Sequence, residues 1–83
     1  MGYTKNRIET VLKNWLDKLG RTDPIGYYLN YSDHTLEIYT TIPGKLIGRA
    51  GVNVDDLKQM MVDEYHSNWN VRFIEIRGGF LNV

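Results

Sequence analysis

The chain has 83 residues, of which 42% are hydrophobic, 24% charged and 12% aromatic, and its ten basic residues balance its ten acidic ones. This composition is typical of one folded domain over residues 1–83 and excludes a disordered chain. Because cysteine is absent, a disulfide framework, a thiolate metal site and a cysteine nucleophile are also excluded. No uninterrupted apolar run exceeds three residues, so we expect no membrane span, no signal peptide and a cytoplasmic location.

The first segment with a clear pattern is helical. Its apolar residues recur at a helical spacing and are Ile8, Val11, Leu12, Trp15, Leu16 and Leu19. This stripe predicts a helix over residues 6–19 that buries Trp15 in the core. Asn6 is the expected N-cap, Glu9 resembles the second residue of a capping box, and Gly20 suits the left-handed position after the helix.

Two segments with strand character follow the helix. Residues 25–31 alternate from face to face, residues 36–41 are rich in β-branched and aromatic side chains, and Ser32-Asp33-His34 suits the turn between them. The pattern predicts an antiparallel hairpin. On the second strand, the residues expected to face the core are Leu36, Ile38 and Thr40.

The second half of the chain predicts two helices and a strand. Pro43 interrupts the preceding strand and suits the first turn of a short helix that ends before Gly48. Asn53 is the expected N-cap of a long helix over residues 53–66, and acidic residues follow in its first turn, where the helix dipole favours them. Residues 69–77 predict the last strand.

Together these elements follow the order α-β-β-α-α-β. We therefore expect an α+β fold in which a three-stranded mixed sheet is covered on one face by three helices, because three strands alone cannot bury a face. A right-handed connection through two helices would make the second and third strands parallel neighbours. The other face of the sheet would then stay open.

The most informative stretch is residues 42–52, IPGKLIGRAGV, with glycines at positions 44, 48 and 51. A P-loop needs lysine and then serine or threonine after its last glycine, and no such sequence occurs here. A dinucleotide-binding fingerprint needs its first two glycines separated by a single residue, whereas Gly44 and Gly48 stand four positions apart. Neither nucleotide-binding loop therefore fits this segment.

A G-x-x-G tetrapeptide, Gly48-Arg49-Ala50-Gly51, remains at the junction of the two predicted helices. Its glycines allow the backbone to reverse without a Cβ collision, and they expose peptide N–H groups at the start of the second helix. Unpaired N–H groups at a helix N-terminus suit a phosphodiester. Arg49 adds a full positive charge, and Ala50 is small enough for a sugar-phosphate backbone to lie close.

These residues resemble the signature of the K-homology (KH) family, in which I-G-x-x-G is followed by a helix. The matching run is Ile47-Gly48-Arg49-Ala50-Gly51, with Pro43-Gly44 before it and Val54 and Leu57 after it. The predicted element order is similar to that of type II, or prokaryotic-type, KH domains. The resemblance spans nearly the whole chain, over residues 6–77.

The resemblance implies non-catalytic binding of single-stranded RNA, or of single-stranded DNA. In KH domains the loop clamps the backbone of about four nucleotides, and the bases turn onto an apolar groove between the helices and an edge strand. By position, the residues expected to bind nucleic acid are Lys45, Ile47, Gly48, Arg49, Ala50, Gly51 and Val54. Leu57, with most of Ile47 and Val54, is expected in the core.

Two other interpretations remain open. The loop would in one case be a tight turn between helices that binds no ligand. In the other, the chain is a KH-fold protein-interaction or assembly module with weak or no RNA binding, which its zero net charge favours. A protein partner would then dock on the acidic helix 53–66 or on the open sheet face, which is expected to display Tyr28, Tyr39 and either Phe73 or Ile74.

No pattern in the chain favours an enzyme, a metal site or a cofactor. His34 and His66 have no serine partner in a catalytic spacing and no second metal ligand nearby in sequence, and both are expected to be exposed. The carboxylate pairs Asp55-Asp56 and Asp63-Glu64 are explained by the helix dipole and by a solvated helix face. Trp69 begins a strand and could cap the edge of the core or stack a nucleic-acid base, and packing in the core is the favoured expectation.

Overall fold

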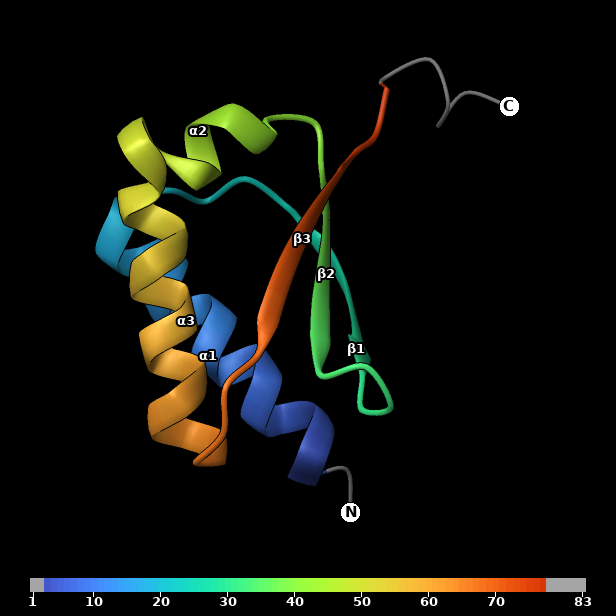
Figure 1. The fold of residues 1–83 in the computed structure, drawn as a ribbon. Helices are drawn as coiled ribbons and strands as arrows, with labels where there is room; N and C mark the ends of the chain where they lie inside the picture. Colours follow the sequence, from blue (N-terminus) through green and yellow to red (C-terminus); the bar gives the residue numbers. More distant parts are fainter. Residues whose placement is uncertain (1–2, 78–83) are drawn as a thin grey trace.

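A mixed three-stranded sheet with helices against one face forms the framework of the chain (Figure 1). The computed structural model describes residues 3–77, with side chains from residue 7 onward. The elements are, in order, α1 (Tyr3–Leu19), β1 (Gly26–Asn30), β2 (Thr35–Thr40), α2 (Pro43–Ile47), the single 3₁₀ turn η1 (Arg49–Gly51), α3 (Val52–Tyr65) and β3 (Asn70–Glu75). The α+β class and the mixed sheet agree with the expectation from the sequence.

The sheet has the order β1-β2-β3, with β2 in the centre. β1 pairs antiparallel with β2 and places Tyr28 opposite Glu37, while β3 pairs parallel with β2 and places Arg72 beside the same Glu37. The expected parallel pairing of the second and third strands is therefore confirmed. It is possible because α2 and α3 return the chain to the end of the sheet where β2 begins.

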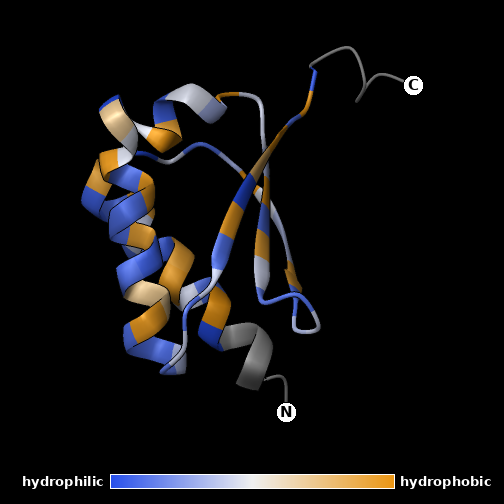
Figure 2. Ribbon diagram, in the orientation of Figure 1, coloured by the Kyte–Doolittle hydropathy of each residue, from blue (hydrophilic) through white to orange (hydrophobic). Residues whose placement is uncertain are grey.

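The core lies between the helices and the face of the sheet that they cover. Leu36, Ile38 and Thr40 on β2 are buried, as their alternation predicts. Hydrophobic and hydrophilic residues alternate along β2 in Figure 2, and Figure 1 shows α1 and α3 on one side of the sheet. Buried residues from the helices and from the approach to β3 include Ile8, Val11, Leu12, Trp15, Leu46, Leu57, Met61 and Trp69.

α1 begins earlier than the capping pattern predicts. It starts at Tyr3, so Asn6 lies inside the helix and the prediction of an N-cap there was wrong. Because no proline or glycine separates these two residues, helical backbone continues through them. Glu9 does not complete a capping box either, since its carboxylate accepts a 2.9 Å hydrogen bond from the Tyr27 hydroxyl on β1. Gly20 has the expected left-handed backbone, with φ of 71°.

β3 is shorter than the predicted strand 69–77, because its pairing with β2 ends where β2 ends, at Thr40. The register decides which apolar residue faces outward. Ile74 lies beside Tyr39 on the open face, whereas Phe73 points toward the helices and packs against the core. The sequence alone left this choice open, since either residue fits a strand of this composition.

Candidate nucleic-acid interface

The segment Gly48–Gly51, called the G-x-x-G loop below, joins α2 to α3 through three residues with positive φ. Gly48, at φ 80° and ψ 169°, occupies a region that is essentially restricted to glycine. Ala50, at φ 55° and ψ 23°, and Gly51, at φ 76° and ψ 15°, are both left-handed. The backbone therefore reverses between the helices within four residues, as the two glycines predict.

Asn53 has a different role from the N-cap that the sequence suggests. α3 begins at Val52, because the left-handed Gly51 already supplies the reversal that a capping residue would provide. Asn53 Nδ2 instead donates a 3.3 Å hydrogen bond back to the carbonyl of Lys45 in α2. The amide passes so close to Gly48 that a Cβ atom there would lie 2.6 Å from Nδ2. Asn53 thus ties the two helices together behind the loop.

Two backbone N–H groups of the loop have no protein acceptor among residues 3–77. The N–H of Gly51 donates to the Gly48 carbonyl at 3.1 Å, and the N–H of Val52 donates to the Arg49 carbonyl. Arg49 and Ala50 are the first two residues of the 3₁₀ turn, and their N–H groups meet no acceptor in that part of the chain. Unpaired donors are therefore present in the loop itself, slightly ahead of the helix start where the sequence predicts them.

The side chains of Arg49, Ala50 and Lys45 are exposed. Among the described residues, no carboxylate lies within 4.0 Å of the charged nitrogens of Arg49 or Lys45. Lys45 still acts on the linker before β1: the hydrogen bond from Arg21 lowers the pKa of Asp23, and the charge of Lys45 lowers it further. Arg49 is thus the cation of the loop that is most available to an anion.

Two carboxylates follow the loop in α3. Asp56 pairs with Lys18 of α1, with its Oδ2 3.4 Å from Nζ, so its charge is partly neutralised. Asp55 is exposed in the first turn, where it stabilises the helix and opposes the approach of an anion. With Lys45 and Arg49 against Asp55, the local charge of the loop region stays positive.

Apolar surface borders the loop on both sides. Leu57 is fully buried, as predicted, whereas Ile47 at the end of α2 and Val54 in the first turn of α3 are only half-buried. α2 and α3 both contact β3, the edge strand on this side of the sheet. Ile47 directly precedes the loop and Val54 lies three residues after it, so partly exposed apolar side chains flank the loop on both sides.

A buried tryptophan anchors the start of α3 to α1. Trp15 is fully buried, and its indole Nε1 donates a 2.9 Å hydrogen bond to the carbonyl of Asn53. The bond satisfies the one polar group of the indole and fixes the first turn of α3. The helical stripe predicts that Trp15 belongs to the core, but no sequence signal indicates an acceptor 38 residues away.

Comparison with protein-family models and with curated proteins yields no match for this chain. The KH resemblance therefore depends on the G-x-x-G loop, its apolar flanks and the order of the elements. The geometry of the loop, with its free N–H groups and unpaired arginine among the described residues, is the basis on which a function can be proposed.

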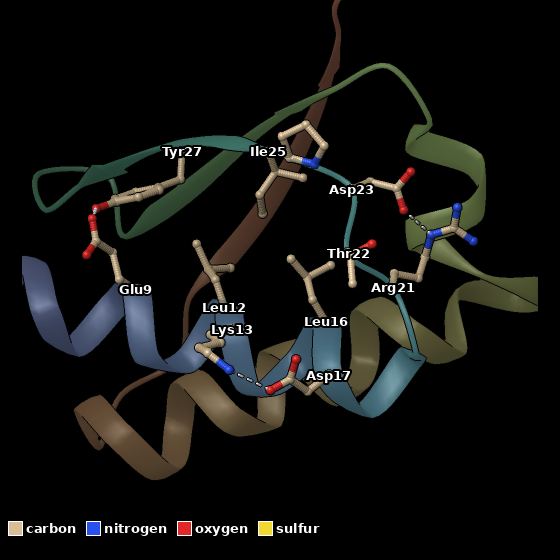
Figure 3. Close-up of a pocket in the computed structure, with 11 residues that line it drawn as sticks. Glu9, Leu12, Lys13, Leu16, Asp17, Arg21, Thr22, Asp23, Ile25 and Tyr27 are labelled. Carbon is tan, nitrogen blue, oxygen red and sulfur yellow. Dashed lines mark hydrogen bonds and ion pairs between the residues drawn. The ribbon is translucent and has the colours of Figure 1, made fainter.

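The larger of two described hollows lies away from the loop, between α1 and the linker that leads into β1 (Figure 3). Its volume is about 530 Å³, and its apolar lining includes Leu12, Leu16, Pro24 and Ile25. Ion pairs border it: Lys13 Nζ lies 3.0 Å from Asp17, and Arg21 Nε lies 2.8 Å from Asp23. No residue of the G-x-x-G loop lines this hollow, so it is separate from the candidate interface.

The raised pKa of Tyr27, which lines this hollow, leads us to expect a loss of stability at high pH. Burial, followed by the hydrogen bond to Glu9, raises the pKa of Tyr27 from 10.0 to about 12. The folded state thus keeps the phenolic proton at pH values where the unfolded state loses it. We expect the free energy of unfolding to fall as the pH rises from about 10 to about 12. Chemical denaturation at a series of pH values measures this decrease, and Tyr27→Phe should make it smaller.

Two other tyrosines also contribute to the pH dependence of the free energy of unfolding. The hydrogen bond to Glu37 raises the pKa of Tyr39, and burial raises the pKa of Tyr65, so both add slope in the same direction. The profile of Tyr27→Phe should therefore be shallower but not flat. An identical pH profile for wild type and Tyr27→Phe would show that titration of Tyr27 has no part in the effect.

Within residues 3–77, no three His, Asp or Glu side chains come together as metal ligands would. No helix in that part of the chain is long and apolar enough to cross a membrane. The carboxylates at the end of α3 make surface contacts: Asp63 accepts a 3.0 Å hydrogen bond from Gln59, and Glu64 pairs with Arg7 at 2.8 Å. Both carboxylates therefore take part in contacts at the surface.

Proposed function

We propose that this chain is a type II KH-like domain that binds single-stranded RNA, or single-stranded DNA, through the G-x-x-G loop and catalyses no reaction. One observation supports the proposal above the others. Arg49 and Ala50 are adjacent and exposed, their backbone N–H groups have no acceptor among the described residues, and the Arg49 guanidinium has no carboxylate within 4.0 Å. An anion can accept from these exposed donors in place of water.

A phosphodiester suits this arrangement in shape as well as in charge. The two N–H groups and the guanidinium of Arg49 donate to its free oxygens, and charge-assisted hydrogen bonds of this kind are stronger than neutral ones. The Ala50 methyl group leaves room for the sugar beside it. The base attached to that sugar turns toward the half-exposed side chains of Ile47 and Val54. Lys45, one turn of α2 before the loop, adds attraction over a longer distance.

Salt dependence tests this proposal. Binding that releases counterions from one or two phosphates makes the logarithm of the association constant fall with the logarithm of salt concentration, with a slope of about −0.7 per phosphate on a single strand. We expect this behaviour for an unstructured RNA oligomer in a fluorescence anisotropy titration. The absence of binding at low salt, or binding that does not change with salt, contradicts the proposal.

Protein interaction through the open sheet face is a second candidate, and a separate observation favours it. A hollow of about 420 Å³ on that face is lined by Tyr39, Ile74, Glu75, Ile76 and Arg77. Tyr28 on the same face is 56% exposed. Exposed apolar surface of this kind commonly marks an interface with another protein. Amide shifts at Tyr28 and Tyr39 that depend on protein concentration, in the absence of RNA, would favour this function.

A further inference from the structure

An ordered aromatic stack lies at the end of α3 opposite the G-x-x-G loop. His34, in the turn between β1 and β2, stacks on Trp69 with ring centroids 4.4 Å apart and planes only 10° from parallel. Tyr31, at the other end of the same turn, meets Trp69 edge-on with centroids 5.6 Å apart. Trp69 is only 5% exposed, so its indole forms the base of the stack, and the two turn residues form its surface.

The His34 ring is fixed in place although it is exposed. Its Nδ1 lies 2.9 Å from the carbonyl of Asn68, which sets the rotation of the ring. The backbone of His34 has φ of 51°, and its carbonyl accepts a 2.8 Å hydrogen bond from Asn70 at the start of β3. One face of the imidazole packs on Trp69 while the residue remains exposed, so solvent reaches the opposite face. A flat ligand would meet an aromatic surface that needs no rearrangement.

We infer that this free face of His34, supported by Trp69, is a stacking site for a nucleobase of the strand whose phosphate lies at the G-x-x-G loop. This inference rests on the proposed function and extends it to a second contact point. Stacking of a base on an aromatic side chain is independent of base identity, because every base has a π-face. The site therefore adds affinity and reach without adding a base preference.

The charges around the stack favour a base over a phosphate. Arg7, which packs on Tyr65 beside the cluster, is occupied: its Nε pairs with Glu64 at 2.8 Å, and its guanidinium carbon lies 4.4 Å from the centre of the Tyr65 ring. Asp33 stands next to His34 in the turn and is held by Asn30, whose Nδ2 lies 3.2 Å from its Oδ2. A phosphate at the stack would be repelled by this carboxylate, whereas an uncharged base would not be.

The distance between the two contact points determines the length of strand that reaches both. The loop precedes α3, and Trp69 follows α3. Figure 1 shows the turn between β1 and β2 at the opposite end of the molecule from the loop. The 14 residues of α3 span roughly 20 Å at 1.5 Å per residue. An oligomer of about four nucleotides, the length that a KH loop clamps, is held along its whole length by the loop and leaves no base for the stack. An oligomer of about ten nucleotides has further bases beyond the clamped four, and these can extend to the stack.

The test compares His34→Ala with His66→Ala on RNA oligomers of these two lengths. His66 is a matched control, because it is also an exposed histidine with a left-handed backbone, at φ 59°, and it ends α3 without joining the stack. We expect His34→Ala to weaken binding of the longer oligomer by about 5-fold or more and to leave the shorter one unchanged. His66→Ala should bind both as wild type does. Thermal melting of both variants checks that they fold.

A second measurement needs no variant. The ring protons of His34 in the wild-type chain should shift upfield on addition of the longer oligomer, because a stacked base lies over the ring, and should not move with the shorter one. If His34→Ala binds the longer oligomer as tightly as wild type does, the stacking site is refuted while the function of the loop stands. If wild type binds neither oligomer, the proposed function fails and the inference fails with it.

Discussion

Replacing both Arg49 and Ala50 with aspartate is expected to abolish binding of single-stranded RNA and to leave the fold intact. The two carboxylates would stand beside the free N–H groups where a phosphate is expected, so repulsion would replace attraction. Loss of two charge-assisted hydrogen bonds corresponds to a decrease in affinity of about 100-fold or more. The fold should survive because both side chains are exposed, and aspartate adopts the left-handed backbone of position 50 more readily than most residues do. Fluorescence anisotropy measures the affinity, and circular dichroism measures the fold.

Thr10→Asp combined with Lys58→Asp is the matched control. Each pair of substitutions changes the net charge by −3, two units from the lost cation and one from the neutral residue, and Thr10 and Lys58 are both exposed and outside the loop. If the global charge decided binding, both double variants would lose it equally. Full affinity in the loop variant, or an equal loss in the control, would contradict a binding site at the loop.

The second large effect concerns stability. We expect Gly48→Ala to lower the free energy of unfolding by at least about 2 kcal/mol, near the middle of the range for a residue forced into a sparsely populated backbone region. Gly48 has φ of 80° and ψ of 169°, and the new Cβ would lie 2.7 Å from Cγ of Asn53. If the Asn53 side chain moves aside, it gives up its hydrogen bond to Lys45. The backbone strain remains in either case.

Two other glycines of the same segment serve as controls. Gly44 lies in α2 without a positive φ, and a Cβ atom added there would meet no neighbouring atom within 4 Å, so Gly44→Ala should be neutral or stabilising by about 0.4–1 kcal/mol. Gly51 has φ of 76° but only an ordinary 3.6 Å contact with Val54, so Gly51→Ala should fall between the other two. Urea denaturation of the three variants gives the order. Equal stability for Gly48→Ala and Gly44→Ala would contradict the backbone geometry of the loop.

Much of the architecture follows from local pattern. The apolar stripe of α1 and the alternation of β2 each state which face is buried, and Trp15, Leu36 and Ile38 are buried accordingly. The boundaries are less predictable, because a capping side chain is only one of several ways to begin a helix. α1 extends past Asn6, and α3 begins at Val52 after a left-handed glycine without any side-chain cap.

In the candidate site, too, some features follow from the local sequence and others depend on tertiary packing. The exposure of Arg49 and Ala50 and the reversal at the two glycines follow from the G-x-x-G pattern. The role of Asn53 does not, because its partner carbonyl is brought near only once α2 and α3 have packed together. The stack of His34 on Trp69 joins the turn between β1 and β2 to the segment between α3 and β3, and neither contains a sequence signal for the other.

The most direct measurement of RNA binding at the loop is a titration of isotope-labelled protein with short single-stranded RNA, followed at each backbone amide by NMR. The free N–H groups of Arg49 and Ala50 would gain an acceptor, so their resonances should move the most, with smaller changes over residues 45–54. Unchanged resonances at Arg49 and Ala50 in the presence of saturating RNA would contradict a phosphate site at the loop. So would shifts confined to Tyr28 and Tyr39, which would assign the interaction to the open sheet face.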